Sequence, residues 1–189
     1  MTRSDAQKRA DFESVALPLM GVLYRTALSL TRQPEDASDV VQETFLRAYR
    51  TFDNFRAGTN ARSWLFTILY SVFTNRRKKA RREENNVPVD ELEAKYWQFA
   101  TYAGPGPDEV ELGQLKSAEV EAALTALPET FRSAVLMVDV NELSYDEAAA
   151  VLECPVGTLR SRLFRARRLL SASLIDYARR QGYTRSKER

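Results

Sequence analysis

The apolar residues in the first part of the chain recur at helical spacing. Three stretches between residues 12 and 82 predict amphipathic helices separated by short breaks. Their apolar stripes are Leu19, Leu23, Ala27 and Leu30, then Val41, Phe45, Ala48 and Phe52, and finally Trp64, Leu65, Ile68, Leu69 and Val72. Pro34 and two following acids mark the start of the second helix, because proline suits the first helical position and acids suit the positive end of the helix dipole. The segment DNFRAGTNARS, residues 53–63, is predicted to be a loop.

A different pattern covers residues 84–113. Proline, glycine and acidic residues are frequent there, and no long periodic stripe is present. We therefore expect a linker. One short helix is expected around Tyr96, Trp97 and Phe99, whose aromatic rings indicate that it docks on another surface.

Helical spacing returns from residue 114. One helix is predicted over residues 115–126, ending before a proline, and a second over residues 130–140. The following sequence, SYDEAAAVLECPVGTLRSRLFRARRLL, begins with Ser144 and Glu147 at the spacing of a capping box. The short helix that they start has an apolar face made by Tyr145, Ala148, Ala149 and Leu152. A short capped helix, a brief turn and a basic helix together indicate a helix-turn-helix.

The basic helix is apolar on one side and rich in arginine on the other. When successive residues are placed about 100° apart around the helix, the apolar residues form one narrow row. This row is predicted to pack on the preceding helices. This row is Val156, Leu159, Leu163, Ala166 and Leu170. The opposite side carries Ser161, Arg165 and Arg168, with Thr158 and Phe164 nearby and Arg160, Arg162 and Arg167 on the flanks.

Two interpretations fit the arginines of this helix. They could simply solvate the exposed side of an amphipathic helix, or they could contact DNA, with the flanks on phosphates and the outward row on base edges. The capping box and turn directly upstream favour DNA contact. Phe164 favours DNA contact too, because an apolar phenyl ring is not expected on a helix face that only contacts water.

The charge of the chain is unevenly distributed. The formal net charge is only +2, but RRKKARR (76–82) and the helix at residues 160–168 are strongly basic, and the stretch between them is acidic. The first basic run ends a helix that carries Trp64, Phe66 and Tyr70. Rings beside cations suit single-stranded nucleic acid, but they equally suit a core helix with a solvated end.

Composition excludes several kinds of chemistry. The chain has no histidine and one cysteine, so a histidine-dependent triad, an intrachain disulfide and an ordinary zinc-ligand set are ruled out. The amino-terminal residues lack the apolar core of a signal peptide, and no apolar run approaches the ~20 residues of a membrane span. We expect a cytoplasmic protein without a metal or cofactor.

Two blocks of the sequence resemble the extracytoplasmic-function (ECF) sigma factors of bacterial RNA polymerase, in the sigma-70 superfamily. The C-terminal block is ALPETFRSAVLMVDVNELSYDEAAAVLECPVGTLRSRLFRARRLL, in which PVGT-x-x-SRL-x-RAR is very specific to that family. The N-terminal block comprises EDASDVVQETFLRAYRTFDNF and ARSWLFTIL. The resemblance implies an all-α fold of two small helical domains joined by a flexible acidic linker. The expected boundaries are a region 2 helical bundle at residues 10–83, the linker at 84–113, and a region 4 helix-turn-helix at 114–180.

The resemblance also implies roles for individual residues. The helix DVVQETFLRAYR is similar to the family's surface for the clamp helices of the largest polymerase subunit, which assigns polymerase contacts to Asp39, Gln42, Glu43 and Arg47. Residues 54–63 and the helix after them correspond to the part that captures flipped −10 bases and melts the promoter. The implied −10 residues are Arg56, Asn60, Trp64, Asn75, Arg76, Arg77 and Lys78. The implied −35 residues are Thr158, Arg160, Ser161, Phe164, Arg165 and Arg168.

The chain departs from the family pattern at a few positions. Ser71 and Leu69 stand where the family often has asparagine and alanine, which affects the −10 preference. Glu153 replaces the usual glycine before the turn, so the turn must close without the most permissive residue. Cys154 is interpreted as a small buried filler rather than a redox sensor.

The implied function is transcription initiation. The chain would bind core RNA polymerase, at the clamp helices and at the flap of the second-largest subunit, and direct it to promoter DNA, with an anti-sigma factor as a further partner. It would act in the cytoplasm, at the nucleoid when active, and would not be an enzyme. The main alternative is a freestanding helix-turn-helix regulator, which would bind duplex DNA tightly without polymerase. A metal-dependent recombinase or nuclease is disfavoured, because the acidic residues do not form a convergent set.

Overall fold

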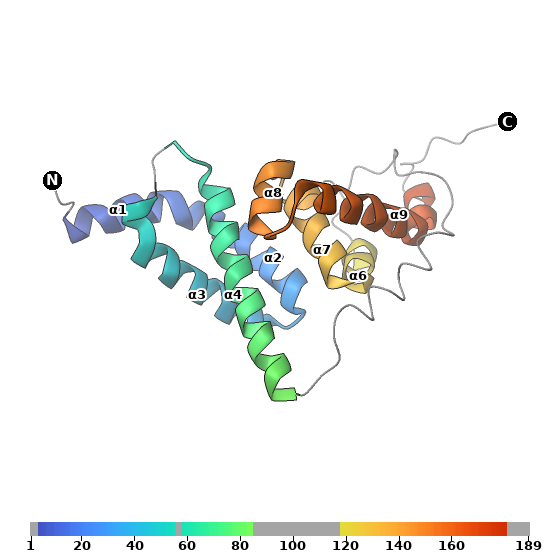
Figure 1. Cartoon of the computed structure of the whole chain (residues 1–189), viewed down its shortest axis with the longest axis horizontal. Coiled ribbons are helices and arrows are strands. Elements are labelled where there is room, and N and C mark those ends of the chain that lie inside the picture. Colours follow the sequence, from blue (N-terminus) through green and yellow to red (C-terminus); the bar gives the residue numbers. More distant parts are fainter. Residues whose placement is uncertain (1–3, 56–57, 85–117, 181–189) are drawn as a thin grey trace. The chain divides into compact units, whose positions relative to one another are not determined.

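A computed structural model describes residues 4–55, 58–84 and 118–180, and within these ranges all regular structure is helical (Figure 1). The chain divides into two compact units, one formed by the helices before residue 85 and one by the helices after residue 117. The all-α prediction with two small helical domains is therefore confirmed. The expected linker helix around Trp97, and nearly all of the expected linker, lie outside the described residues.

In its described residues, 4–55 and 58–84, the N-terminal unit has four α-helices and two short 3₁₀ turns. Its elements are α1 (Asp5–Ala16), η1 (Leu17–Leu19), α2 (Met20–Thr31), α3 (Pro34–Thr51), η2 (Phe52–Asn54) and α4 (Ala61–Glu84). Pro34 and the two acids that follow it stand in the first turn of α3, as predicted. The expected loop at residues 53–63 is partly helical at both ends, because η2 and the first turn of α4 extend into it.

Helices α2, α3 and α4 pack against one another around the core of this unit. The buried side chains include Leu23, Ala27 and Leu30 of α2, Val40, Val41 and Ala48 of α3, and Leu65, Phe66, Leu69, Val72 and Phe73 of α4. Trp64 and Ile68, predicted to be core, are only half-buried. The α4 core row is therefore rotated slightly from the predicted stripe, toward Phe66 and Phe73.

Aromatic rings connect α1 to the segment between α3 and α4. Phe12 makes edge contacts with Phe45, Tyr49 and Phe52, at centroid distances of 6.1, 5.2 and 5.3 Å. Phe55 continues the series by stacking on Phe52 at 5.8 Å. The rings thereby hold the entry to α4 against α1 and α3.

By length and composition alone, the helical segment Asp5–Thr31 could cross a membrane, although no single apolar run of that length was expected. The structure breaks this segment with the 3₁₀ turn η1 at Pro18. Leu23, Ala27 and Leu30 are buried in the core that α2 shares with α3. A core helix can have the same length and composition as a membrane-spanning helix, so these two features are weak evidence for a span.

The C-terminal unit contains α6 (Ala118–Ala126), α7 (Glu129–Val135), η4 (Leu136–Val140), α8 (Tyr145–Val151) and α9 (Val156–Arg180). The helix predicted over residues 130–140 is α7 followed by η4, which is a π-helical turn rather than more α-helix. In this turn the Asn141 backbone N–H donates to the Leu136 carbonyl five residues earlier, at 2.9 Å, and the Asn141 side-chain amide donates to the same oxygen at 2.7 Å. The side chain of a buried asparagine therefore stabilises the irregular end of the helix.

The core of this unit lies where α6 and α7 pack on α9. Leu159, Leu163, Ala166 and Leu170 are buried as predicted, and Leu174 extends the row, while Val156 is part-exposed. Phe131, Leu136 and Met137 are among the largest fully buried side chains opposite them.

One charged side chain is buried in this core. Arg132 of α7 is 3% exposed, and its guanidinium donates to the backbone carbonyls of Thr125 (3.1 Å) and Leu127 (3.4 Å) at the end of α6. The last carbonyls of a helix have no partner inside that helix. Arg132 therefore caps α6 and joins it to α7.

We expect Arg132→Met to lower the free energy of unfolding of the C-terminal unit by about 2 kcal/mol, because methionine keeps the apolar stem but leaves buried carbonyls unpaired. Hydrogen exchange of the full chain measures this locally, as faster exchange of α6 and α7 amides. The control is Arg162→Met, at a half-exposed position of α9. Its free energy of unfolding is expected to lie within about 0.5 kcal/mol of that of the native protein. Equal effects of the two substitutions would contradict the capping role.

Candidate nucleic-acid interface

The helix-turn-helix is formed by α8, a tight turn and α9. The predicted capping box is present at the start of α8: Ser144 Oγ accepts from the Glu147 N–H at 3.2 Å, and Glu147 Oε2 accepts from the Ser144 N–H at 2.9 Å. Glu153 closes the turn with a left-handed φ of 50°, the conformation that glycine adopts most readily. Cys154, interpreted as a buried filler, is in fact partly exposed in this turn.

The outward side of α9 carries the residues predicted to contact the −35 element. Arg160 and Phe164 are exposed, and Thr158, Ser161, Arg165 and Arg168 are half-exposed. Phe164 is 51% exposed, unusually high for a phenyl ring, and the Arg168 guanidinium lies 5.8 Å from its centroid. Burial lowers the pKa of Arg165 from its ordinary value, because solvent is partly excluded from the guanidinium. This row therefore presents forked donors, a hydroxyl and an apolar ring side by side.

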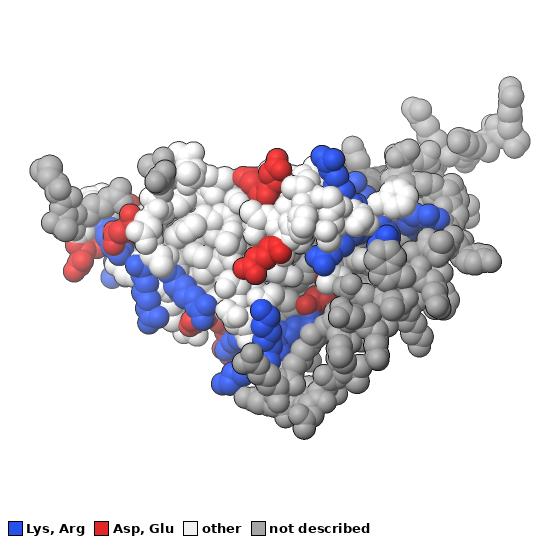
Figure 2. Space-filling model, viewed as in Figure 1, with Lys and Arg blue, Asp and Glu red and all other residues white. Residues whose placement is uncertain are grey.

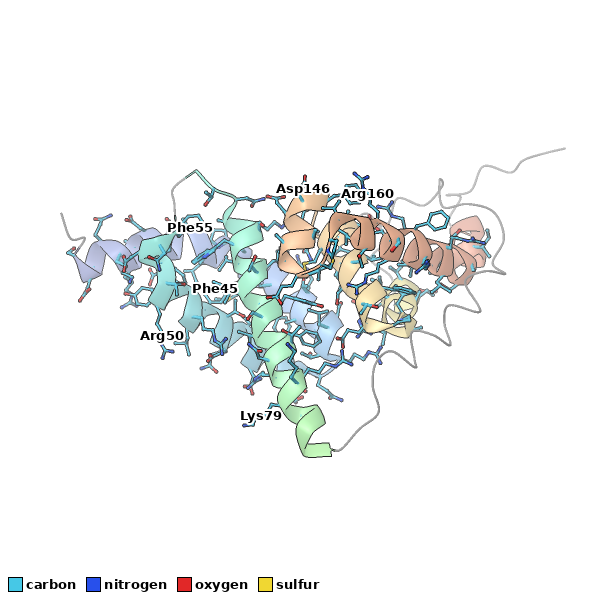
Figure 3. All side chains as sticks on the ribbon, viewed as in Figure 1. Phe45, Arg50, Phe55, Lys79, Asp146 and Arg160 are labelled. Carbon is cyan, nitrogen blue, oxygen red and sulfur yellow. The ribbon has the colours of Figure 1, made fainter. Side chains whose placement is uncertain are left out.

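The cations of the C-terminal unit follow α9. Figure 2 shows arginine side chains spread along this helix, and Figure 3 labels Arg160 near the start of α9, beside α8. The Arg160 guanidinium lies 5.7 Å from the centre of the Tyr145 ring. Tyr145, predicted to belong to the apolar face of α8, is instead part-exposed and supports this arginine.

Arg167, on a flank predicted to reach phosphates, is paired with an acid of the same unit. Its Nε and Nη2 atoms donate to the two carboxylate oxygens of Asp139, at 3.1 and 2.5 Å. The two side chains are only 33% and 12% exposed. Asp139 raises the pKa of Arg167 above its ordinary value, with a smaller contribution from the Tyr145 hydroxyl. This forked pair joins α9 to the π-helical turn 28 residues earlier in the chain.

The predicted −10 residues are distributed over the start and the far half of α4. Asn60 Oδ1 accepts the backbone N–H groups of Arg62 and Ser63, at 3.0 and 3.3 Å, so Asn60 is the N-cap of α4. Trp64 lies half-buried against Phe55, with ring centroids 4.8 Å apart. Arg56 is outside the described residues. The DNA contacts of these residues stay predictions.

The far half of α4 brings two predicted sites together. Lys78 is exposed and Arg77 half-buried, and Figure 3 labels the neighbouring Lys79 near the exposed end of the helix. Asn75 and Arg76, predicted to contact DNA, line the same groove as the predicted polymerase contacts. This groove lies between α3 and α4 and is lined by Asp39, Gln42, Glu43, Leu46, Arg47, Val72, Asn75 and Arg76.

Ion pairs balance the charge of the groove. Arg76 Nη2 lies 2.9 Å from Asp39 Oδ2, and Arg47 Nε lies 2.7 Å from Glu43 Oε1. The hydrogen bond from Arg47 holds the pKa of Glu43 below its ordinary value. Two carboxylates and two guanidinium groups thus neutralise each other, although the sequence suggested an acidic patch for a basic partner.

Sequence reasoning missed two kinds of site residue. Leu46 is 48% exposed in the groove, and the available signal was its position one residue out of the apolar stripe, next to Phe45. Asp139 had no such signal, because its partner Arg167 lies on a different helix. Among the described residues, no group of three or more acids or cysteines is arranged to hold a metal ion.

Fold and site define a two-domain DNA-binding protein with a C-terminal helix-turn-helix. The chain matches the family models for Sigma-70 region 2 at residues 18–83 and for Sigma-70, region 4 at residues 117–170. It is 40% identical to the ECF RNA polymerase sigma factor EcfG of Rhodopseudomonas palustris over 148 residues, which cover 78% of this chain and 76% of that protein. It is 35% identical to the ECF RNA polymerase sigma-E factor of Escherichia coli over 147 residues, or 77% of each chain.

Solved structures give the same result. The sigma factor RpoE of Bartonella quintana, in complex with the anti-sigma factor NepR, is similar with a TM-score of 0.66 and 30% identity, covering 87% of this chain and 97% of that one. CnrH, in complex with the cytosolic domain of CnrY, is similar with a TM-score of 0.58 and 26% identity, covering 89% and 90%. The chain belongs to the ECF RNA polymerase sigma factors, and it is a transcription initiation factor.

Replacing Glu153 by glycine is expected to stabilise the C-terminal unit by about 0.5–1 kcal/mol, because glycine removes the steric cost of the left-handed φ. Glu153→Ala is the matched control, since alanine keeps the Cβ atom and should give no gain. Hydrogen exchange of α8 and α9 amides in the full chain measures both. A gain from alanine equal to that from glycine would show that the glutamate charge, not the backbone, is responsible.

The Asp139–Arg167 pair is expected to contribute about 1–2 kcal/mol to the stability of the C-terminal unit, less than a fully buried pair because Arg167 is partly solvated. The single variants Asp139→Asn and Arg167→Met and the double variant form a thermodynamic cycle. Hydrogen exchange at η4 and α9 should show that the second substitution costs little once the first is present. Fully additive losses would mean that the two side chains do not depend on each other.

Proposed function

We propose that this protein binds bacterial core RNA polymerase and directs it to promoters by reading a −35 element with α9 and capturing unpaired −10 bases with the N-terminal unit. The observation that carries the proposal is the outward row of α9. It places arginine forks, the Ser161 hydroxyl and the exposed Phe164 ring on the helix that follows a capped helix and a tight turn. In such motifs the second helix enters the major groove.

The roles of the individual side chains follow from their chemistry. Arg165 and Arg168 are suited to guanine, which offers two acceptors to a guanidinium fork in the major groove. Phe164 is suited to a thymine methyl group, and the Thr158 hydroxyl to either kind of base edge. The Ser161 hydroxyl donates to the Thr158 carbonyl at 2.9 Å, so it is suited to a donor on a base edge. Arg160, on the edge of the row, and Arg162, on the flank, are suited to phosphates. Arg167 is assigned no DNA contact, because Asp139 occupies its donors.

In the N-terminal unit the proposed −10 surface consists of the entry to α4 and its cationic end. Rings at the entry, such as Trp64, offer stacking surfaces for unpaired bases, and cations such as Arg77 and Lys78 follow the backbone. Asn60 has its side-chain oxygen engaged as a helix cap, which fixes the orientation of this side chain at the entry to α4. The domain boundaries proposed for these roles are residues 10–83 and 114–180, joined by residues 84–113.

The proposed partners are core polymerase, through α3 to the clamp helices of its largest subunit and through the C-terminal unit to the flap of the second-largest, and promoter DNA. An anti-sigma factor is proposed as an inhibitor, because the similar sigma factor RpoE was solved in complex with the anti-sigma factor NepR, and CnrH in complex with the cytosolic domain of CnrY. The chain would act as a specificity factor without a catalytic step of its own. Its place of action would be the cytoplasm, at the nucleoid when bound to DNA.

The first experiment mixes the purified chain with bacterial core polymerase and selects promoter fragments from a random library with this mixture. The chain, core polymerase and the labelled selected fragments are then run together on a sizing column. Co-elution with core, and tight DNA binding only when core is present, is the expected result. Sequence-specific binding of duplex DNA by the chain alone, without co-elution, would instead favour a freestanding helix-turn-helix regulator.

Within the reconstituted holoenzyme, Arg165→Ala is expected to weaken binding to the selected −35 sequence by about 1–3 kcal/mol and to relax the preference for one base pair. Arg162→Ala is the comparison, because loss of a phosphate contact should weaken all sequences alike and lower the slope of log affinity against log salt by about one. Fluorescence anisotropy over a salt series measures both quantities. Uniform weakening by Arg165→Ala would contradict its proposed base contact.

A further inference from the structure

The groove between α3 and α4 joins residues that the sequence assigned to two different partners. Asp39, Gln42 and Glu43 come from α3, and Asn75 and Arg76 come from α4. The cavity measures about 220 Å³, enough to receive one large side chain of another protein. A groove of this kind serves one partner more naturally than two, because a protein seated in it covers both walls.

Helix geometry separates Arg76 from the other cations of the basic run. Val72, Asn75 and Arg76 stand three and four residues apart, so they share the face of α4 that is turned toward α3. Lys78 lies about 200° around the helix from Arg76 and is exposed to solvent. The basic run is therefore two-sided, with Arg76 committed to the groove and Lys78 exposed on another side of the helix.

The ion pairs decide which chemistry the groove accepts. Arg76 lies against Asp39, and Arg47 against Glu43, so the polar rim carries no net charge. The exposed Leu46 side chain lines the same space. A strand of phosphates is a poor fit, because a rim without net charge gives it no net electrostatic attraction. A protein helix that presents an apolar side chain flanked by polar groups of both signs fits the groove.

We propose that the core polymerase surface of this protein extends from α3 across the groove onto α4, and that Asn75 and Arg76 contact the polymerase rather than −10 DNA. This inference rests on the proposed function, since it names further residues of the same polymerase-binding surface. Arg76 then contributes in two ways: it orients the Asp39 carboxylate, and it offers its remaining donors to the partner. The −10 surface of α4 is confined to its entry and to the side that bears Lys78.

The test uses the full chain with Arg76→Ala, Arg76→Lys or Lys78→Ala. The Asp39–Arg76 pair is exposed and adds little to stability, so the substitutions are expected to leave the fold intact, which circular dichroism and thermal unfolding check. Two affinities are measured for each variant. The first is that of the labelled chain for core polymerase, and the second is that of the reconstituted holoenzyme, at saturating core, for a single-stranded −10 oligonucleotide.

Arg76→Ala is expected to weaken core binding about tenfold, as truncation of a central interface arginine commonly does, and to leave oligonucleotide binding by the holoenzyme within about twofold. Arg76→Lys keeps the charge and should retain most of the affinity for core. Lys78→Ala is expected to show the opposite pattern, with unchanged core binding and weaker, less salt-dependent oligonucleotide binding.

An Arg76→Ala variant that binds core normally and loses oligonucleotide affinity, as Lys78→Ala does, would overturn the inference while leaving the proposed function intact. Gln42→Ala distinguishes the remaining cases, because it removes a groove residue of α3 without breaking an ion pair. Loss of core affinity in Gln42→Ala but not in Arg76→Ala would restrict the surface to α3. Absence of core binding by the native chain would refute the proposed function itself, and the inference with it.

Discussion

The burial of one apolar row of α9 is the constraint on which the DNA-reading geometry depends. Leu159, Leu163, Ala166 and Leu170 are packed against α6 and α7, so the opposite side of the helix must face outward. A helix turns about 100° per residue, and once one row is buried the direction of every other side chain is set. The Asp139–Arg167 pair adds a second constraint, because a forked contact resists sliding and rotation of the helix more than a single one does.

The N-terminal unit uses the same physical device at a different surface. Packing of α4 on α3 places Arg76 against Asp39, 37 residues away in the chain, and so turns part of a basic run into one wall of a neutral groove. In each unit, then, one arginine of a basic cluster is taken by a distant acid. Arg160 and Lys78, by contrast, are exposed to solvent. This division gives a chain of nearly zero net charge two distinct kinds of surface.

Membership of the ECF sigma factors gives these surfaces a common purpose. A factor of this class has to recognise a large enzyme and DNA with a small number of helices, and the two tasks need different chemistry. Recognition of duplex DNA needs exposed guanidinium groups and an apolar side chain on one face of a helix, as on α9. Recognition of a protein partner needs shape and balanced polar groups around an apolar side chain, which is the chemistry proposed for the groove at Leu46.

The sequence by itself determined the helices, the capping box at Ser144 and Glu147, the left-handed position at Glu153 and the outward row of α9, because each follows from spacing and local hydrogen bonding within one stretch of chain. It also determined the family, through a motif dense enough to be specific. Only the tertiary structure decided which arginines are engaged, that residues 136–140 form a π-helical turn, and that Leu46 and Arg76 share a groove. The engaged arginines and the groove depend on contacts between residues 28 and 37 positions apart, and no periodic pattern along the chain encodes the distance between two packed helices.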